Sequence, residues 1–344
     1  MCLALAAWLG GVFAAAGAPV DPLQLPAAPS SLAVRSPLFA ITRAGTRLVA
    51  VGQRGHVMLS DDNGAHWLQA EVPLSTDLVA VHFPSAQKGW AVGHDGVILH
   101  SSDGGRHWTR QLDGRQAASL VADAYTKTTH NVEADAALAE ARRMLADGPD
   151  LPFLDVWFSD ERNGYAVGAF NLIFATSDGG AHWRPASDRA DNPKGLHLYG
   201  VRAAGDEIYI VGELGLVLRL DRTSQRFRAL PTPYPGTWFG LLATPDLLLA
   251  YGLRGNAWRS RDAGKSWQQI DTGVLTGLTG ATLLADGRIA LVSQGGQVLV
   301  SRDKADSFQS VPGIKLQSIF GVSAAGARAL ALVGARGVRV EAIE

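Results

Sequence analysis

The stretch VGHDGVILHSSDGGRHW, Val92–Trp108, decides the fold, because it holds one complete copy of a motif that recurs along the chain. An apolar segment is followed by an alternating strand and then by the polar turn Ser101-x-Asp103-x-Gly105-x-x-Trp108. Alternation of apolar and polar residues is the period-two signal of a half-buried β-strand. The polar turn could hold a metal, serve catalysis or simply reverse the chain.

The same unit occurs seven times, and its copies begin at Val51, Val92, Val167, Val211, Tyr251, Val292 and Val333. Successive copies start 41, 75, 44, 40, 41 and 41 residues apart. A period near 40 with four short strands per unit is typical of β-propellers. The sequence therefore predicts an all-β fold, a seven-bladed β-propeller of four-stranded antiparallel blades.

Each unit divides into four strands, A to D from the centre outward. In the second unit we expect strands A to D at residues 77–83, 89–94, 97–102 and 107–112. The seventh unit has no strand D. Residues 23–35 precede the first strand A, expected at 37–43, and could supply that outer strand and so remove an open sheet edge.

The polar turn has four close copies: Ser60-Asp62-Gly64-Trp67, Ser101-Asp103-Gly105-Trp108, Thr176-Asp178-Gly180-Trp183 and Ser260-Asp262-Gly264-Trp267. The aspartate can accept hydrogen bonds from its own turn, the glycine permits a positive φ, and the tryptophan can start strand D and pack between blades. A helix-loop-helix calcium site needs oxygen ligands at several alternate positions and a final bidentate glutamate. We therefore interpret these turns as structural, with no metal or cofactor.

Three histidines, His66, His107 and His182, directly precede the tryptophans of these turns. They belong to separate blades, so they are not expected to share one metal ion. We interpret them as exposed residues at the edges of strands.

The long second interval contains an insertion at about residues 114–150 that is rich in helix formers. Leu138, Ala141 and Leu145 share one helical face, and Gly148-Pro149 should end that helix. A shorter helix is expected near 117–125. The resulting helical hairpin would lie on the face of the D-to-A connections, either as a partner-binding element or as a cap over the channel.

The B-to-C turns should lie on that same face, opposite the polar turns. Arg54, Arg254 and Arg336 occupy matched positions in the B-to-C turns of blades one, five and seven. They could form a basic arc for a carboxylate, a phosphate or an acidic peptide, or be three solvated turn tips. Tyr234 and Trp238 lie in a D-to-A connection and could contact a protein partner, with core packing as the alternative for Trp238.

The composition excludes several other functions. Net charge is −1 over 344 residues, which favours neither nucleic acid nor an anionic membrane as the partner. The single cysteine, Cys2, excludes an intramolecular disulfide framework. Residues 2–18 are apolar and end in Ala-Gly-Ala, so we expect a signal peptide at 1–18 and one propeller domain at 19–344. Such a protein would be periplasmic or secreted, would not span the membrane after cleavage, and is expected to be a monomer.

Three stretches carry a resemblance to a known family: GYAVGAFNLIFATSDGGAHW, YGVRAAGDEIYIVGELGLVLR and LLLAYGLRGNAWRSRDAGKSW. They resemble the photosystem II stability/assembly factor family of seven-bladed propellers with Asp-box (BNR) repeats, from about Leu23 onward. The resemblance implies a non-catalytic lumenal or periplasmic protein that helps to assemble a membrane complex. Its partner would be a protein, such as a membrane-complex subunit or a transporter. The helical insertion departs from the simplest family pattern and favours a non-photosynthetic bacterial member.

The alternative is an Asp-box glycoside hydrolase, either sialidase-like or glucanase-like. A sialidase-like site needs an arginine cluster, a tyrosine nucleophile with a glutamate, and an aspartic acid. Only Asp95 and Glu213 are acidic in the B-to-C turns, and they belong to non-adjacent blades. We find no convincing carboxylate pair and no zinc-peptidase, serine-hydrolase or P-loop motif, so we expect no enzyme.

Overall fold

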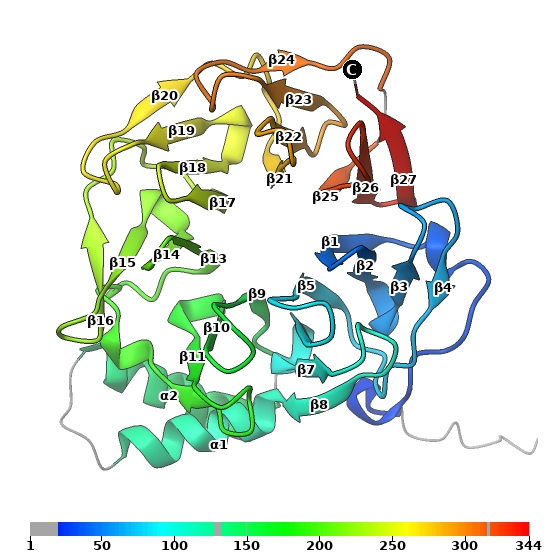
Figure 1. Ribbon diagram of the computed structural model, residues 1–344. Helices are drawn as coiled ribbons and strands as arrows, with labels where there is room; N and C mark the ends of the chain where they lie inside the picture. Colours follow the sequence, from blue (N-terminus) through cyan, green and yellow to red (C-terminus); the bar gives the residue numbers. More distant parts are fainter. Residues whose placement is uncertain (1–19, 127–131, 149, 315–316, 344) are drawn as a thin grey trace, which may run out of the picture.

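Seven antiparallel sheets follow one another around a common axis in the computed structural model (Figure 1). The structure describes residues 20–126, 132–148, 150–314 and 317–343. Among these residues, six sheets have four strands and the last has three. The strands of each blade lie in sequence order from the axis outward. This arrangement confirms the predicted seven-bladed β-propeller.

The strands fall into four classes. The A strands are β1 (Leu38–Ala44), β5 (Leu78–His82), β9 (Phe153–Phe158), β13 (Leu198–Ala204), β17 (Trp238–Thr244), β21 (Leu278–Leu283) and β25 (Ile319–Ala324). The B strands are β2 (Arg47–Gly52), β6 (Gly89–Gly93), β10 (Gly164–Gly168), β14 (Glu207–Gly212), β18 (Leu247–Gly252), β22 (Ile289–Ser293) and β26 (Ala329–Gly334). The C strands are β3 (Val57–Ser60), β7 (Ile98–Ser101), β11 (Ile173–Thr176), β15 (Val217–Asp221), β19 (Ala257–Ser260), β23 (Val298–Ser301) and β27 (Gly337–Ala342). The D strands are β4 (Leu68–Gln69), β8 (Thr109–Leu112), β12 (Arg184–Pro185), β16 (Arg226–Leu230), β20 (Gln268–Ile270) and β24 (Gln309–Ser310).

The core lies between the blades, along the middle strands. Every residue of β2, β6 and β18 is buried, whereas β24 is fully exposed. A strand that is covered on both faces needs apolar side chains on both, which explains the near-continuous runs RLVAVG and LLLAYG. Each blade thus buries its B strand against two neighbours, and the outer strands carry the polar surface.

The helical pair expected after the second blade is present as α1 (Gly114–Tyr125) and α2 (Val132–Asp147). Asp113 caps α1, because its carboxylate accepts from the Arg115 and Gln116 N–H groups while the Gln116 side chain accepts from the Asp113 N–H. The predicted face of α2 is partly wrong. Leu138 and Ala141 are buried, but Met144 takes the place expected for Leu145, which is half exposed.

The helices lie against the outer rim of blades 2 and 3 (Figure 1). α1 contacts β12 and the turn at His94–Gly96, and α2 contacts the short helix at Ser187–Arg189. The Tyr125 hydroxyl donates to Asp188 Oδ1 at 2.9 Å and so ties the end of α1 to blade 3. These contacts place the described helices at the rim, not over the axis.

The prediction that residues 23–35 supply the missing outer strand is wrong. The segment forms short 3-10 helices at Pro22–Gln24 and Ala33–Arg35. Between them it follows blade 1, where the Ala27 N–H donates to the Val72 carbonyl at 3.0 Å. The ring closes instead through contacts of β1 with β25 and β26.

In the part of the chain that the structure describes, no helix has the length and apolar character needed to cross a membrane. The predicted signal peptide at residues 1–18 lies outside the described residues.

Candidate functional site

The B-to-C turns and the D-to-A connections lie on one face of the disc, which we call the B–C face. Hydrogen bonds join the two sets: the Arg54 N–H donates to Oδ1 of the Asp77 side chain at 2.8 Å, and the Gly215 N–H donates to the Gly236 carbonyl at 2.6 Å. On the opposite face, the polar turns contact the A-to-B loops, as where the Gly104 N–H donates to the Gln87 carbonyl at 2.8 Å.

The same irregularity in strand pairing, repeated in every blade, shapes the mouth of the central channel. Where strand A pairs with strand B, the register skips the second residue of the A strand. A β-bulge of this kind redirects the skipped side chain. The seven skipped residues, which we call the bulge ring, are Phe39, Val79, Leu154, Tyr199, Phe239, Thr279 and Phe320, and all line one cavity of about 170 Å³.

The bulge ring is half-buried and mostly apolar. Its aromatic members meet in pairs: the Phe39 and Phe320 ring centroids lie 5.8 Å apart, and those of Tyr199 and Phe239 lie 5.9 Å apart. Our sequence reasoning did not single out this set. The signal was available, since each residue is the second of an A strand and recurs with the repeat.

Below the ring, one charged pair stands in the channel wall. Asp155 is buried, and its Oδ2 accepts from the Val201 N–H at 2.8 Å and from Arg202 at 2.5 Å. The matched positions of the other blades hold only alanine or glycine: Ala40, Ala80, Gly200, Gly240, Gly280 and Gly321. Asp155 therefore joins blade 3 to blade 4 at a position where no other blade carries a charge.

His82 lies close to this pair but stays neutral. Burial, with the nearby Arg202 charge, lowers the pKa of His82 to about 3. Its Nδ1 accepts a hydrogen bond from the Phe158 N–H at 3.2 Å. The imidazole thus links blade 2 to blade 3 and adds no positive charge to the channel at neutral pH.

The three arginines expected to form a basic arc are all exposed on the B–C face. Arg54 and Arg254 sit at matched turn tips with φ of 56° and 57°. Arg336 differs, because the positive φ of its turn falls on Gly337. Arg54 and Arg336 belong to adjacent blades, whereas blade 6 separates Arg254 from blade 7. The arc as a binding site stays a prediction.

Trp238 cannot contact a partner directly, so that part of the prediction is wrong. Only 1% of its surface is exposed, because it begins β17 with its side chain in the core between blades 4 and 5. Tyr234 packs against it, with ring centroids 4.4 Å apart, and remains half-exposed. The exposed apolar side chains of this face are instead Phe170, Leu214, Leu253 and Leu275, which our sequence reasoning did not single out as partner contacts.

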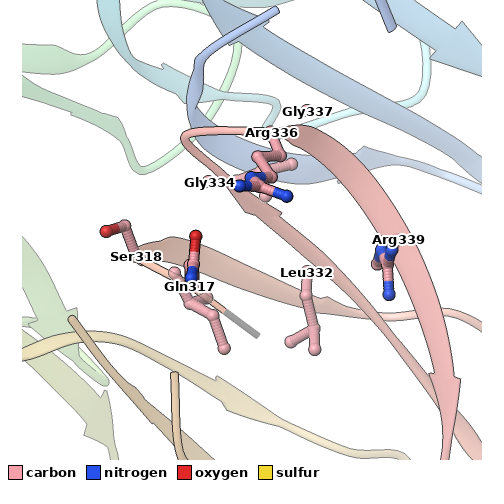
Figure 2. Close-up of a pocket in the computed structure, with 9 residues that line it drawn as sticks. Gln317, Ser318, Leu332, Gly334, Arg336, Gly337 and Arg339 are labelled. Carbon is pink, nitrogen blue, oxygen red and sulfur yellow. The ribbon is translucent and has the colours of Figure 1, made fainter. Parts of the chain in front are cut away.

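Arg336 also lines a separate cavity of about 200 Å³ in blade 7. Figure 2 shows Arg336 and Arg339 beside Leu332, Gln317 and Ser318. The cavity joins basic, polar and apolar groups in one place.

The polar turns have the geometry expected of structural elements. In the second blade, Asp103 Oδ1 accepts from the Arg106 and His107 N–H groups at 3.0 and 3.1 Å. The Gly105 N–H donates to Ser101 Oγ at 2.8 Å, and Gly105 has a φ of 88°. Trp108 is buried and directly precedes β8.

The histidines of these turns are exposed, as expected, and each also pairs with its own aspartate. The Nδ1 atoms of His66, His107 and His182 lie 2.7, 2.5 and 2.7 Å from the carboxylates of Asp62, Asp103 and Asp178. They face three separate turns, and no group of residues suited to a metal ion occurs in the described chain.

These turns should make the fold sensitive to acid. The His182 backbone N–H and ring lower the pKa of Asp178 to about 2, and the Ser266 hydroxyl and N–H do the same for Asp262. A carboxyl group whose pKa is depressed on folding stabilises the fold above its ordinary pKa, near 3.8. That contribution is lost as pH falls from about 4 through 2.

We therefore expect the melting temperature of the Asp178→Asn, Asp262→Asn double variant to fall less than that of the wild type between pH 4.5 and 2.5. Scanning calorimetry at several pH values measures this difference. If the melting temperatures of the two proteins fell equally with pH, protonation of Asp178 and Asp262 would not be linked to unfolding. A constant difference between the two melting temperatures, present already at pH 7, would not change that conclusion.

Comparisons with known proteins agree with this architecture. A family model described as "Photosynthesis system II assembly factor YCF48" matches residues 38–120 and 145–311. A "Photosystem II assembly lipoprotein Ycf48" of Synechococcus sp. (strain CC9902) is 27% identical over 180 residues, and that of Synechococcus sp. (strain CC9605) is 30% identical over 180. Each alignment covers 48% of this chain, which spans about half (52%) of these curated relatives.

Among solved structures, one described as "YCF48 bound to D1 peptide" has a TM-score of 0.65 at 15% identity, covering 95% of this chain and 98% of that one. This likeness supports the fold alone. The family model, however, spans more than half of the chain and includes units from all but the seventh blade. The chain belongs to the Ycf48 family of photosystem II assembly factors.

Proposed function

We propose that this protein is a non-catalytic assembly factor that binds a protein subunit of a membrane complex through the B–C face. The observation that carries this proposal is the bulge ring, with its aromatic side chains at the channel mouth, surrounded by exposed apolar and arginine side chains of one face. Aromatic and arginine side chains dominate the energetics of protein interfaces. A solved relative was captured with a D1 peptide, which supports a peptide as the ligand.

The two kinds of group on this face suit an amphipathic segment. Phe170, Leu214 and Leu253 project from the turns of blades 3 to 5, so apolar contacts concentrate there. Arg54 and Arg336 lie on blades 1 and 7. A peptide across the channel mouth would place apolar residues over blades 3 to 5 and acidic residues over blades 7 and 1, with a further acidic residue beside Arg254 of blade 5.

We assign the protein to the periplasm or the secreted fraction, because of the apolar residues 2–18 and the lipoprotein relatives. Its partner would be a membrane-complex subunit or a transporter component, and the propeller would act as a monomer. A glycosidase is the weaker candidate. Asp95 accepts a hydrogen bond from the Thr76 hydroxyl and Glu213 from the His197 N–H at 2.8 Å, so each ties a B-to-C turn to the neighbouring D-to-A connection.

Reversal of three charges tests the proposed face. We expect Arg54→Glu, Arg254→Glu, Arg336→Glu to reduce partner capture about tenfold, because like charges then oppose the acidic part of the ligand. The measurement is quantitative mass spectrometry after cross-linking of the tagged protein to membranes of its own source. The matched control reverses Arg106, Arg162 and Arg222, which are exposed on the opposite face.

Both variants should melt at the wild-type temperature, since exposed arginines contribute little to stability. Equal capture by the two triple variants would contradict the proposed face. Turnover of a sialoside or a β-glucan by the wild type would instead support the glycosidase.

A further inference from the structure

Among the residues that the structure describes, the outer edge of blade 7 has no paired strand. In every other blade a D strand covers the outside of strand C, but β27 pairs only with β26 among the residues that the structure describes. The connection into blade 1 is nevertheless in place. The Val34 carbonyl lies against Gly337, just as the Leu74 carbonyl lies against Gly55. Residues 33–35 therefore act as a D-to-A connection that no D strand precedes.

The residues before this connection form hydrogen bonds with blades 1 and 2. The Gln69 side chain accepts from the Ser30 N–H at 2.9 Å and donates to the Ala28 carbonyl at 3.0 Å. Arg110 of β8 donates to the Leu23 carbonyl at 3.1 Å. The segment is thus held along blades 1 and 2, and it leaves the place of a seventh D strand unoccupied by any described residue.

The edge itself is well formed for pairing. β27 pairs with β26 in regular register over all six of its residues and contains neither a proline nor a bulge. Alternate residues of an edge strand direct their N–H and C=O groups outward, where they can pair with another segment. Arg339, Val340 and Ala342 are exposed along it. Proteins usually protect such an edge with a proline, a bulge or a cover, and β27 has only its charges.

The charges around the edge are mainly positive. Arg336 and Arg339 line the cavity at one end of β27 (Figure 2), and exposed Arg35 adjoins Gly337. None of these three arginines forms a salt bridge with a residue that the structure describes. At the other end, Arg302 and Arg328 line a second hollow of about 550 Å³ beside Ala342. Within β27 itself only Glu341 is acidic.

The other side of β27 is apolar. Val338 packs in the cluster that contains Leu48 and Met58 of blade 1, and Val340, 38% exposed, lies against Gly64. Side chains of an added strand alternate between the two sides of a sheet. One set would meet the valines and Trp67, and the other would meet Arg339.

We propose that the open edge of β27 binds an extended, acidic segment of a partner protein as the fourth strand of blade 7. Main-chain hydrogen bonds would give affinity, and the alternation of apolar and acidic side chains would give specificity. This site lies on the rim of the disc. It shares Arg35 and Arg336 with the B–C face, whereas Arg339 and the edge of β27 belong to this site alone, so a variant at Arg339 tests it separately.

A selection from a phage-displayed octapeptide library on the full chain tests the site. We expect enrichment of peptides in which valine, isoleucine or threonine alternates with aspartate or glutamate. The enriched peptide is then synthesised with a fluorescent label and titrated by fluorescence anisotropy. Arg339→Glu should weaken its binding about tenfold, whereas Arg184→Glu, an exposed arginine on the D strand of blade 3, should leave binding unchanged.

N-methylation of the peptide distinguishes strand addition from general attraction of charge. Methyl groups on one set of alternate amides should abolish binding, and those on the other set should not, because only one set pairs with β27. Failure to enrich acidic peptides, or equal binding of both methylated peptides, would overturn the proposal. Binding that appears only after removal of residues 1–19, or a dimer that excludes the peptide, would also overturn it, because the occupant would then be this chain.

Discussion

Replacement of Trp90 by alanine is expected to lower the free energy of unfolding by about 3–5 kcal/mol. Trp90 has no exposed surface, and its ring lies on that of Phe158, with centroids 3.6 Å apart and planes 11° apart. The indole therefore joins blade 2 to blade 3. Its Nε1 also donates to Gln111 at 3.1 Å, and Gln111 in turn donates to the Gly179 carbonyl of blade 3 at 2.8 Å. The substitution would leave a cavity at the interface between blades 2 and 3 and would remove the hydrogen bond to Gln111.

Urea unfolding followed by circular dichroism measures this effect. Trp267→Ala, at a half-buried tryptophan in the polar turn of blade 5, is the matched control and should cost less. Trp90→Phe should recover part of the loss, because a smaller ring can still stack on Phe158. Equal losses for Trp90→Ala and Trp267→Ala would show that the stacked pair contributes nothing beyond ordinary burial.

Replacement of Asp155 by alanine is the second large effect, at about 3 kcal/mol. The variant leaves the buried Val201 N–H without its acceptor and Arg202 without its counter-charge. The Arg202 side chain is 39% exposed to the channel, so water can solvate it and the cost falls at the low end of the range for a broken buried pair. Steric fit is not the cause, because alanine already occupies the matched positions 40 and 80.

Two further variants separate the parts of this loss. Asp155→Asn keeps an oxygen for the Val201 N–H and should lose about half as much. Addition of Arg202→Ala to Asp155→Ala should restore part of the stability, since the unpaired charge is removed. A wild-type denaturation midpoint for Asp155→Ala would rule out the ion pair as a link between blades 3 and 4.

Features that depend on neighbouring residues followed directly from the sequence. The turn around Asp103 and Gly105 needs only its own hydroxyl, carboxylate and positive φ, so its role could be predicted without knowledge of the fold. The face of α2 was less certain, because Met144 and Leu145 both satisfy the helical period. Packing against blade 3 selects Met144.

Features of the candidate site depended on contacts between distant residues. Trp238 and Phe239 are adjacent aromatic residues, and no local pattern says which of them enters the core. The bulge between strands A and B sends Trp238 inward and Phe239 to the channel mouth. In the same way, composition did not show that residues 23–35 would bond to blade 1 and not pair with β27.

The sequence by itself determined the number of blades, the order of their strands and the role of the polar turns, because each repeat carries its own alternation and turn chemistry. Only the tertiary structure decided which side chains surround the channel and which strand has no outer partner among the described residues. Those features arise where seven inner strands converge and where the ring closes, and there the environment of a residue is set by segments far away in the chain.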